Sequence, residues 1–152
     1  MSRLLIDADG CPVKPEAYRV AQRHALSVVV VANTWLAVPA ARWIELVVVS
    51  DRADAADDWI AAHAGPGDIV VTADIPLAAR CVAGGASVLD PRGREFTEHS
   101  IGEALANREI GEQLRAIGAI TRGPAPLERQ DRSRFLQRLD ELVRTIARRG
   151  GK

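Results

Sequence analysis

The chain has 152 residues, of which 47% are hydrophobic, and its 20 basic and 20 acidic side chains balance. This length fits one ordinary domain, the apolar fraction excludes a disordered chain, and the balanced charge gives no sign of a strongly basic nucleic-acid binder. No apolar run reaches the roughly 18–20 residues of a membrane helix. The first residues also lack a signal-peptide pattern, so we expect a cytoplasmic protein with no membrane contact.

Strands and helices alternate along the first two thirds of the chain. Short apolar runs predict five strands, at residues 4–7, 27–32, 44–49, 68–72 and 87–89. Helical patterns predict helices between them, at residues 14–24, 54–64 and 75–82. Because strands that alternate with helices form right-handed crossovers, this order predicts an α/β fold with a mainly parallel sheet flanked by helices.

The remaining chain is predicted to be helical and without strands. Helical pieces are expected at residues 100–105, 107–117 and 132–149, with Gly118 ending the second and a loop at residues 122–126. The last helix is amphipathic, with an apolar face made of Phe135, Leu136, Leu139, Leu142, Val143 and Ile146. We therefore expect one domain over residues 1–152, in which the basic segment 122–152 packs on the sheet.

Acidic side chains follow two of the predicted strands directly. Asp7 and Asp9 come after the first strand, and Thr72 and Asp74 come after the fourth. Residues two apart in an extended segment point the same way, so each pair can face one site. Ligands of parallel sheets bind beyond the carboxyl ends of the strands, which is where these side chains are expected to meet.

Further acids stand where the third and fifth strands end. Asp54, Asp57 and Asp58 share one face of the predicted helix that follows the third strand, and Asp90 follows the fifth. Each has a plainer interpretation: Asp54 and Asp74 are good helix N-caps, and Asp57 or Asp58 can be a solvated charge favoured by the helix dipole.

Carboxylates gathered at one edge repel each other unless a cation neutralises them. Oxygen ligands suit Mg²⁺ or Mn²⁺, and such ions activate water for phosphodiester hydrolysis. The residues predicted to bind the metal are Asp7, Asp9, Asp54, Asp57 and Asp74. The predicted catalytic residues are Asp7, Asp9, Asp57 and Asp74.

Basic and polar side chains are candidates for binding a substrate. Lys14, Arg92 and Arg132 could contact phosphate, or in the case of Lys14 simply be solvated. Asn33 ends the second strand and either orients a ligand or makes a turn. Thr72 belongs to the same set of predicted substrate-binding residues.

Two other residue types allow a functional and a structural interpretation. Cys11 stands at a helix start that would stabilise a thiolate, but with no His nearby in sequence we favour a packed small residue. Cys11 and Cys81 are both expected to be reduced. Trp35 and Trp43 flank a loop, where they could stack on bases, although core packing is the favoured interpretation.

Residues 6–14 (IDADGCPVK) and 72–78 (TADIPLA) resemble the YaiI/YqxD family, a bacterial family without an established activity. Further matching pieces lie at residues 31–33, 54–57, 90–93, 123–124 and 131–135, so the likeness covers nearly the whole chain. That family is similar in fold to PIN-like nuclease domains. The resemblance implies a three-layer domain whose parallel sheet of about five strands carries an acidic Mg²⁺ or Mn²⁺ pocket that cuts RNA or DNA.

The PIN-like pattern can be transferred to residues of this chain. Its first acid corresponds to Asp7, its Thr-x-Asp element to Thr72 and Asp74, and an acid on a later helix to Asp54, Asp57 or Asp58. The chain departs from the family at Gly10, where Ala is usual, and at Asp90, where Asn is usual. The second acid of the PIN pattern is commonly Glu, and no Glu stands at the matching place.

Three functions compete. The first is a metal-dependent nuclease. The second is a haloacid-dehalogenase-type phosphatase, whose Asp-x-Asp-Gly motif fits residues 7–10. The order of its remaining motifs is wrong here, because Asp57 and Asp58 precede Thr72 and no Lys lies between Lys14 and Lys152. The third is a non-catalytic module that binds RNA or a protein through a vestigial pocket.

Overall fold

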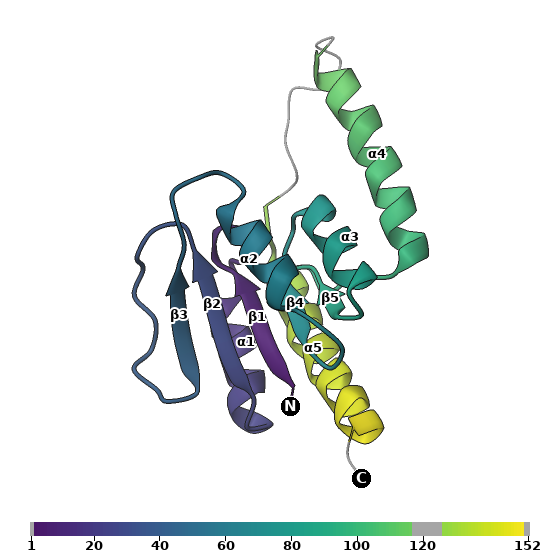
Figure 1. Ribbon diagram of the computed structural model, residues 1–152. Coiled ribbons are helices and arrows are strands. Elements are labelled where there is room, and N and C mark those ends of the chain that lie inside the picture. Colours follow the sequence, from purple (N-terminus) through teal and green to yellow (C-terminus); the bar gives the residue numbers. More distant parts are fainter. Residues whose placement is uncertain (1, 117–125, 151–152) are drawn as a thin grey trace.

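Five parallel strands and one short antiparallel strand form a single sheet, shown in Figure 1. The structure is a computed structural model that describes residues 2–116 and 126–150. The strand order is β3-β2-β1-β4-β5-β6. The strands are β1 (Arg3–Asp7), β2 (Ser27–Ala32), β3 (Ile44–Val48), β4 (Ile69–Val71), β5 (Ser87–Leu89) and β6 (Glu95–Phe96).

Helices cover both faces of this sheet. They are η1 (Ala8–Gly10), α1 (Lys14–Arg23), α2 (Ala55–His63), α3 (Ile75–Ala83), α4 (Glu98–Ala116) and α5 (Arg129–Gly150). Helices α1 and α5 pack on one face, α2 and α3 pack on the other, and α4 contacts α3. The predicted three-layer α/β fold with a mainly parallel sheet is therefore confirmed, and it is consistent with a PIN-like arrangement. Among the helices of the described residues, none combines the length and hydropathy that crossing a bilayer requires.

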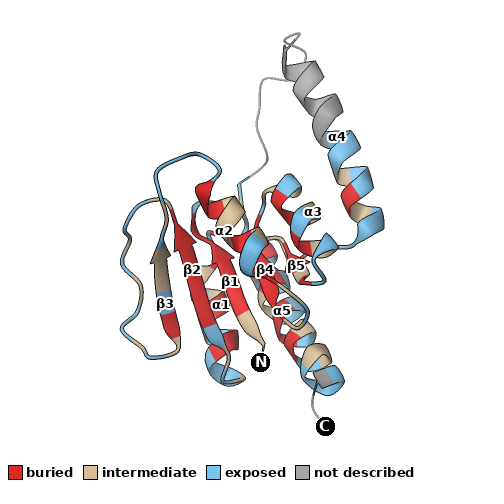
Figure 2. Ribbon diagram, viewed as in Figure 1, coloured by how far each residue is buried: buried red, intermediate tan, exposed pale blue. Residues whose placement is uncertain are grey.

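The central strands are buried on both faces, as Figure 2 shows in red. Successive side chains of a strand point to opposite faces, so Leu4 and Ile6 of β1 join the core under α1 and α5, whereas Leu5 joins the core under α2 and α3. The run of valines in β2 divides between the two cores in the same way. Continuous apolar runs are expected for strands covered on both sides.

The structure corrects the prediction that no strand follows residue 89. Strand β6 has two residues, Glu95–Phe96, which is too short for any periodicity to be visible in the sequence. Helix α4 is continuous, so the expected break between residues 105 and 107 is wrong; Asn107 lies inside the helix rather than at its start. The expected stop at Gly118 and most of the loop at residues 122–126 lie outside the described residues.

A turn after β5 fastens the C-terminal helix to the sheet. Asp90 Oδ1 accepts hydrogen bonds from the backbone N–H groups of Arg92 and Arg94, at 2.9 and 2.8 Å. The Arg92 guanidinium donates to Asp131 of α5 at 2.8 Å. Gly93 has a φ of +86°, and a Cβ built there would lie 2.9 Å from backbone atoms of α5. This close approach of two backbones leaves room for glycine alone.

We predict that Gly93→Ala lowers the free energy of unfolding by at least about 2 kcal/mol, because the new methyl group adds a clash to a strained backbone angle. Gly102→Ala is the matched control: it lies in α4, and no described atom lies within 4 Å of a Cβ placed there. The control should be neutral or stabilising by up to about 1 kcal/mol. Urea denaturation of both variants measures the difference, and equal effects would contradict the packing described.

Candidate functional site

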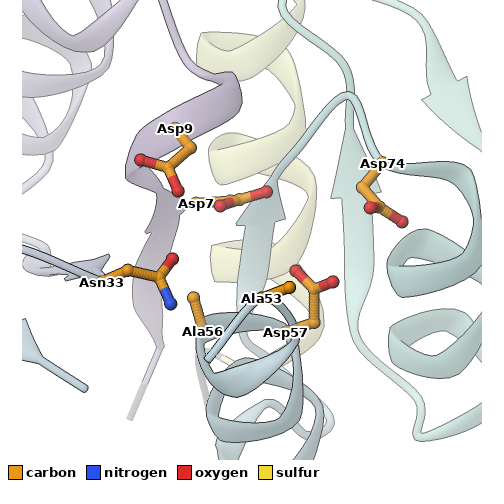
Figure 3. A pocket seen from close by; sticks show the side chains of 7 residues that line it. All are labelled: Asp7, Asp9, Asn33, Ala53, Ala56, Asp57 and Asp74. Carbon is orange, nitrogen blue, oxygen red and sulfur yellow. The ribbon is translucent and has the colours of Figure 1, made fainter. Parts of the chain in front are cut away.

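The site lies where the chain reverses its direction of travel across the sheet. From β1 the chain proceeds outward to β2 and β3, then returns to β4 on the other side of β1. Connections diverge at such a switch point and leave a crevice beyond the carboxyl ends of the strands. A cavity of about 260 Å³ opens here, and Figure 3 shows its lining. The lining residues are Asp7, Asp9, Asn33, Ala53, Ala56, Asp57 and Asp74.

Asp7 is the most enclosed of these acids, with 7% of its surface exposed. It is the last residue of β1, and its Oδ2 accepts a hydrogen bond of 2.9 Å from Thr72 Oγ1 at the end of β4. Burial raises the pKa of Asp7; the Thr72 hydrogen bond opposes this, and the charges of Asp9 and Asp74 add to it. The structure therefore holds a carboxylate in place where its negative charge is poorly solvated.

Thr72 links the two strand ends. Its side chain is fully buried, donates to Asp7 and accepts a 3.0 Å hydrogen bond from the backbone N–H of Asp74. Asp74 in turn caps α3, since its Oδ1 accepts from the backbone N–H of Leu77 at 2.9 Å. Asp74 thus fulfils the capping interpretation and lines the cavity as well. Thr72 acts on the site by positioning both acids.

Asp57 approaches the cavity from the first turn of α2. Burial, followed by the charges of Asp74 and Asp7, raises its pKa to about 6 against the opposing effect of Arg80. These causes show that acids from three separate elements act on one another through space. The carboxyl of Asp57 therefore ionises well above the usual range for an aspartate.

Asn33 closes the side of the cavity next to β2. Its Nδ2 donates to the carbonyl oxygens of Ser50 and Arg52, both at 2.9 Å, which ties the loop after β2 to the loop after β3. Figure 3 shows the amide oxygen of Asn33 on the side that faces Asp7 and Asp9. The two hydrogen bonds donated by Nδ2 fix this orientation. The cavity therefore gains an uncharged oxygen that can accept a hydrogen bond or bind a cation.

Two of the predicted acids lie apart from the cavity. Asp54 is exposed and pairs with Arg52 at 3.0 Å; it occupies the N-cap position of α2, but within the described part of the chain its side chain makes no capping hydrogen bond. Asp58 lies between Arg52 and Arg80, at 3.1 and 2.8 Å. Neither is among the described residues that line the cavity. Of the predicted metal ligands, Asp7, Asp9, Asp57 and Asp74 are brought together and Asp54 is not.

The predicted basic substrate contacts have structural partners, and none is among the described residues that line the cavity. Lys14 Nζ donates to the carbonyl oxygens of Ala8 and Cys11, at 3.0 and 3.1 Å, and so supports the short η1 turn that carries Asp9. Arg132 donates to the Pro12 carbonyl at 2.9 Å. Arg92 pairs with Asp131, as described above.

Small side chains create the space, and no motif or periodicity in the sequence pointed to them. Ala53 and Ala56 line the cavity beside Asp57, where larger residues would fill it. Cys11 is buried, and burial raises its pKa to about 11, which fits the favoured interpretation of a packed residue rather than a nucleophile. Both cysteines are free thiols.

The donor set suits a hard cation, although no enclosed cage is present. Among the described residues, no three His, Cys, Asp or Glu side chains are placed to surround a metal ion. Mg²⁺ is commonly held by only one or two carboxylates, with waters and substrate phosphates completing its shell. An open cavity lined by four aspartates and an amide oxygen fits that mode of binding. Burial first, and then the charges of the neighbouring aspartates, raise the pKa values of Asp7 and Asp57, and a bound cation would oppose both effects.

These features define an α/β protein with an acidic pocket at the switch point of a mainly parallel sheet. Residues 5–145 match the model of the uncharacterised YaiI/YqxD family, and the chain belongs to that family. It is 55% identical over 143 residues to a UPF0178 protein of Caulobacter vibrioides, with 94% of each chain covered. It is 57% identical over 143 residues to one of Gluconacetobacter diazotrophicus, covering 94% of this chain and 93% of that protein.

A UPF0178 protein of Brucella ovis is 54% identical over 148 residues, covering 97% of this chain and 92% of its own. No solved structure matched the chain. The expected family membership is therefore confirmed, while the family itself carries no assigned activity.

We predict that the metal-free protein becomes less stable as pH rises from about 4 to about 7. The pKa of Asp57 is about 6 in the folded chain against 3.8 for an unperturbed carboxyl, so the folded state binds more protons in that window. Asp57→Asn should remove this contribution and gain stability relative to wild type as pH rises. Urea denaturation in a chelator at about pH 5 and about pH 7 measures it. If the free energy of unfolding changed with pH in the same way for both proteins, Asp57 would make no such contribution.

Proposed function

We propose that the protein is a cytoplasmic Mg²⁺- or Mn²⁺-dependent nuclease that hydrolyses phosphodiester bonds of RNA or DNA at the acidic cavity. One observation carries the proposal: Asp7 and Asp9, Asp57, and Asp74 come from three separate parts of the chain and line one cavity. None of the described residues that line it is basic. Two buried free thiols are in keeping with a reducing compartment.

The carboxylates of the cavity differ in how firmly the surrounding structure holds them. Hydrogen bonds hold Asp7 through Thr72, and Asp74 through the start of α3. These two are the residues we expect to hold the cation, with waters and substrate phosphates completing its shell. Asp9 is exposed at the mouth, on the short turn that Lys14 supports. Fixed carboxylates lower the cost of ordering the site when it binds a cation.

A divalent cation bound here would supply an activated water and stabilise the oxygen that leaves the phosphorus. Side chains of the protein would supply the proton acceptor and the group that orients the water or substrate. Asp57 lines the same cavity from α2 and is suited to accept a proton from the attacking water. The amide oxygen of Asn33 can orient a water or a ribose hydroxyl, because its Nδ2 is already engaged.

The phosphatase alternative requires a lysine in the site, and the described residues that line the cavity include none. That chemistry places a lysine beside the nucleophilic aspartate, whereas Lys14 donates to two backbone carbonyls and is not among the described residues that line the cavity. The non-catalytic alternative uses the same cavity, and it differs in outcome: RNA would bind without being cut.

We predict slow cleavage of single-stranded RNA in Mn²⁺, abolished by a chelator. Asp7→Asn and Asp57→Asn should each lower the rate by at least about 100-fold, because each removes a charge that holds the cation or moves a proton. Asp54→Asn is the matched control, since Asp54 precedes the same helix as Asp57 but lies outside the cavity. The control should retain wild-type activity.

Gel analysis of end-labelled RNA measures these rates. Cleavage that survives the chelator or the Asp7→Asn change would exclude the proposed mechanism. If Asp54→Asn lost as much activity as Asp57→Asn, the active site would not be the cavity described. RNA binding with no cleavage in either metal would favour the non-catalytic module.

A further inference from the structure

Trp35 is the most exposed large apolar side chain among the described residues, with 74% of its surface open to solvent. The favoured expectation of core packing is wrong for Trp35, whereas Trp43 at the other end of the same loop does pack against the core. A tryptophan gains more free energy from burial than almost any other side chain. Its exposure therefore marks this position as one where a partner can supply the missing contact.

The neighbours of Trp35 hold it outward. Leu36 and Val38 pack against the core under α1 and α5, while Ala37 is exposed. Inward and outward side chains therefore alternate over residues 35–38, and the packing of Leu36 and Val38 leaves Trp35 and Ala37 facing solvent. The indole thus stands on a loop that is fastened on both sides, and its exposure follows from where its neighbours are buried.

This loop begins at the acidic cavity. Asn33 lines the cavity and is fixed by its two hydrogen bonds, and Trp35 is two residues further along the chain. Two residues span at most about 7 Å. The backbone of Trp35 therefore lies at the same edge of the sheet as the carboxylates, close enough for a molecule that extends from the cavity to reach the exposed indole.

We propose that Trp35 is a stacking platform for an unpaired base next to the cavity, so that the substrate is a single-stranded nucleic acid; this rests on the proposed function. Bases within a duplex are stacked on both sides, and only an unpaired base can offer a face to an indole. Stacking is also insensitive to charge, which matters beside four aspartates that repel a phosphate backbone.

A nucleic acid fits this position better than a protein partner. Contiguous exposed apolar patches mark the surfaces where proteins dock. The exposed neighbours of Trp35 on the loop, Thr34 and Ala37, are small, and the adjacent apolar residues Leu36 and Val38 are turned to the core. A lone flat ring beside an oxygen-lined cavity matches the two parts of a nucleotide, a base and a phosphate held through a cation.

The test measures the affinity of the full chain for a fluorescent single-stranded oligonucleotide and for its duplex, in Mn²⁺. All proteins carry Asp57→Asn, which removes the proposed proton acceptor and keeps Asp7 and Asp74 for the cation, so that binding is read without cleavage. Adding Trp35→Ala should weaken single-strand binding at least about fivefold, and Trp35→Phe should weaken it less. Duplex affinity should not change. Leu105→Ala, which shortens another exposed apolar side chain on α4, is the control and should have no effect.

Unchanged single-strand affinity in Trp35→Ala would overturn the inference, as would an equal loss for the duplex. If Trp35→Ala instead alters self-association in analytical ultracentrifugation and leaves oligonucleotide affinity unchanged, the indole contacts protein and the inference is wrong. The two proposals fail separately. Cleavage that does not depend on Trp35 overturns only the platform, and Trp35-dependent binding without cleavage by the wild-type chain overturns only the nuclease.

Discussion

The hydrogen bond between Thr72 Oγ1 and Asp7 Oδ2 joins the ends of the two strands between which the chain switches direction. It is a buried, charge-assisted contact, and such contacts are stronger than hydrogen bonds between neutral groups. Through the same hydroxyl, Thr72 also positions the backbone of Asp74 and so the start of α3. The placement of the acidic cavity depends on this one side chain, which itself never reaches solvent.

Around this contact the protein keeps negative charges together without basic residues in the described lining. Several acids elsewhere are paired closely with basic side chains: Asp58 with Arg52 and Arg80, Asp131 with Arg92 and Arg134, and Asp140 with Arg23, His24 and Arg144. The carboxylates of the cavity differ from these acids, because the described lining holds no basic side chain to pair with them. Unmatched carboxylates with raised pKa values cost stability, and sites that carry such a cost are commonly functional.

Much of this could be predicted from the sequence, because strand order alone places Asp7 and Asp74 at one edge, and helical spacing brings Asp57 toward them. Asp54 lies outside the site because its side chain, at the start of a helix, turns to solvent and pairs there with Arg52. Lys14, Arg92 and Arg132 were predicted as phosphate contacts, but their partners depend on tertiary packing that no local pattern reveals. Trp35 was expected in the core, and Leu36 and Val38 occupy that place instead.

The central claim is that the clustered carboxylates form one site whose charge a divalent cation neutralises. Calorimetric titration of Mn²⁺ into the full chain near pH 6, in two buffers with different ionisation enthalpies, tests it most directly. Because the pKa of Asp57 is about 6, binding should release a proton from a partly protonated cavity, and the observed heat should change with the buffer. Absence of binding, or a binding heat that is the same in both buffers, would contradict the account.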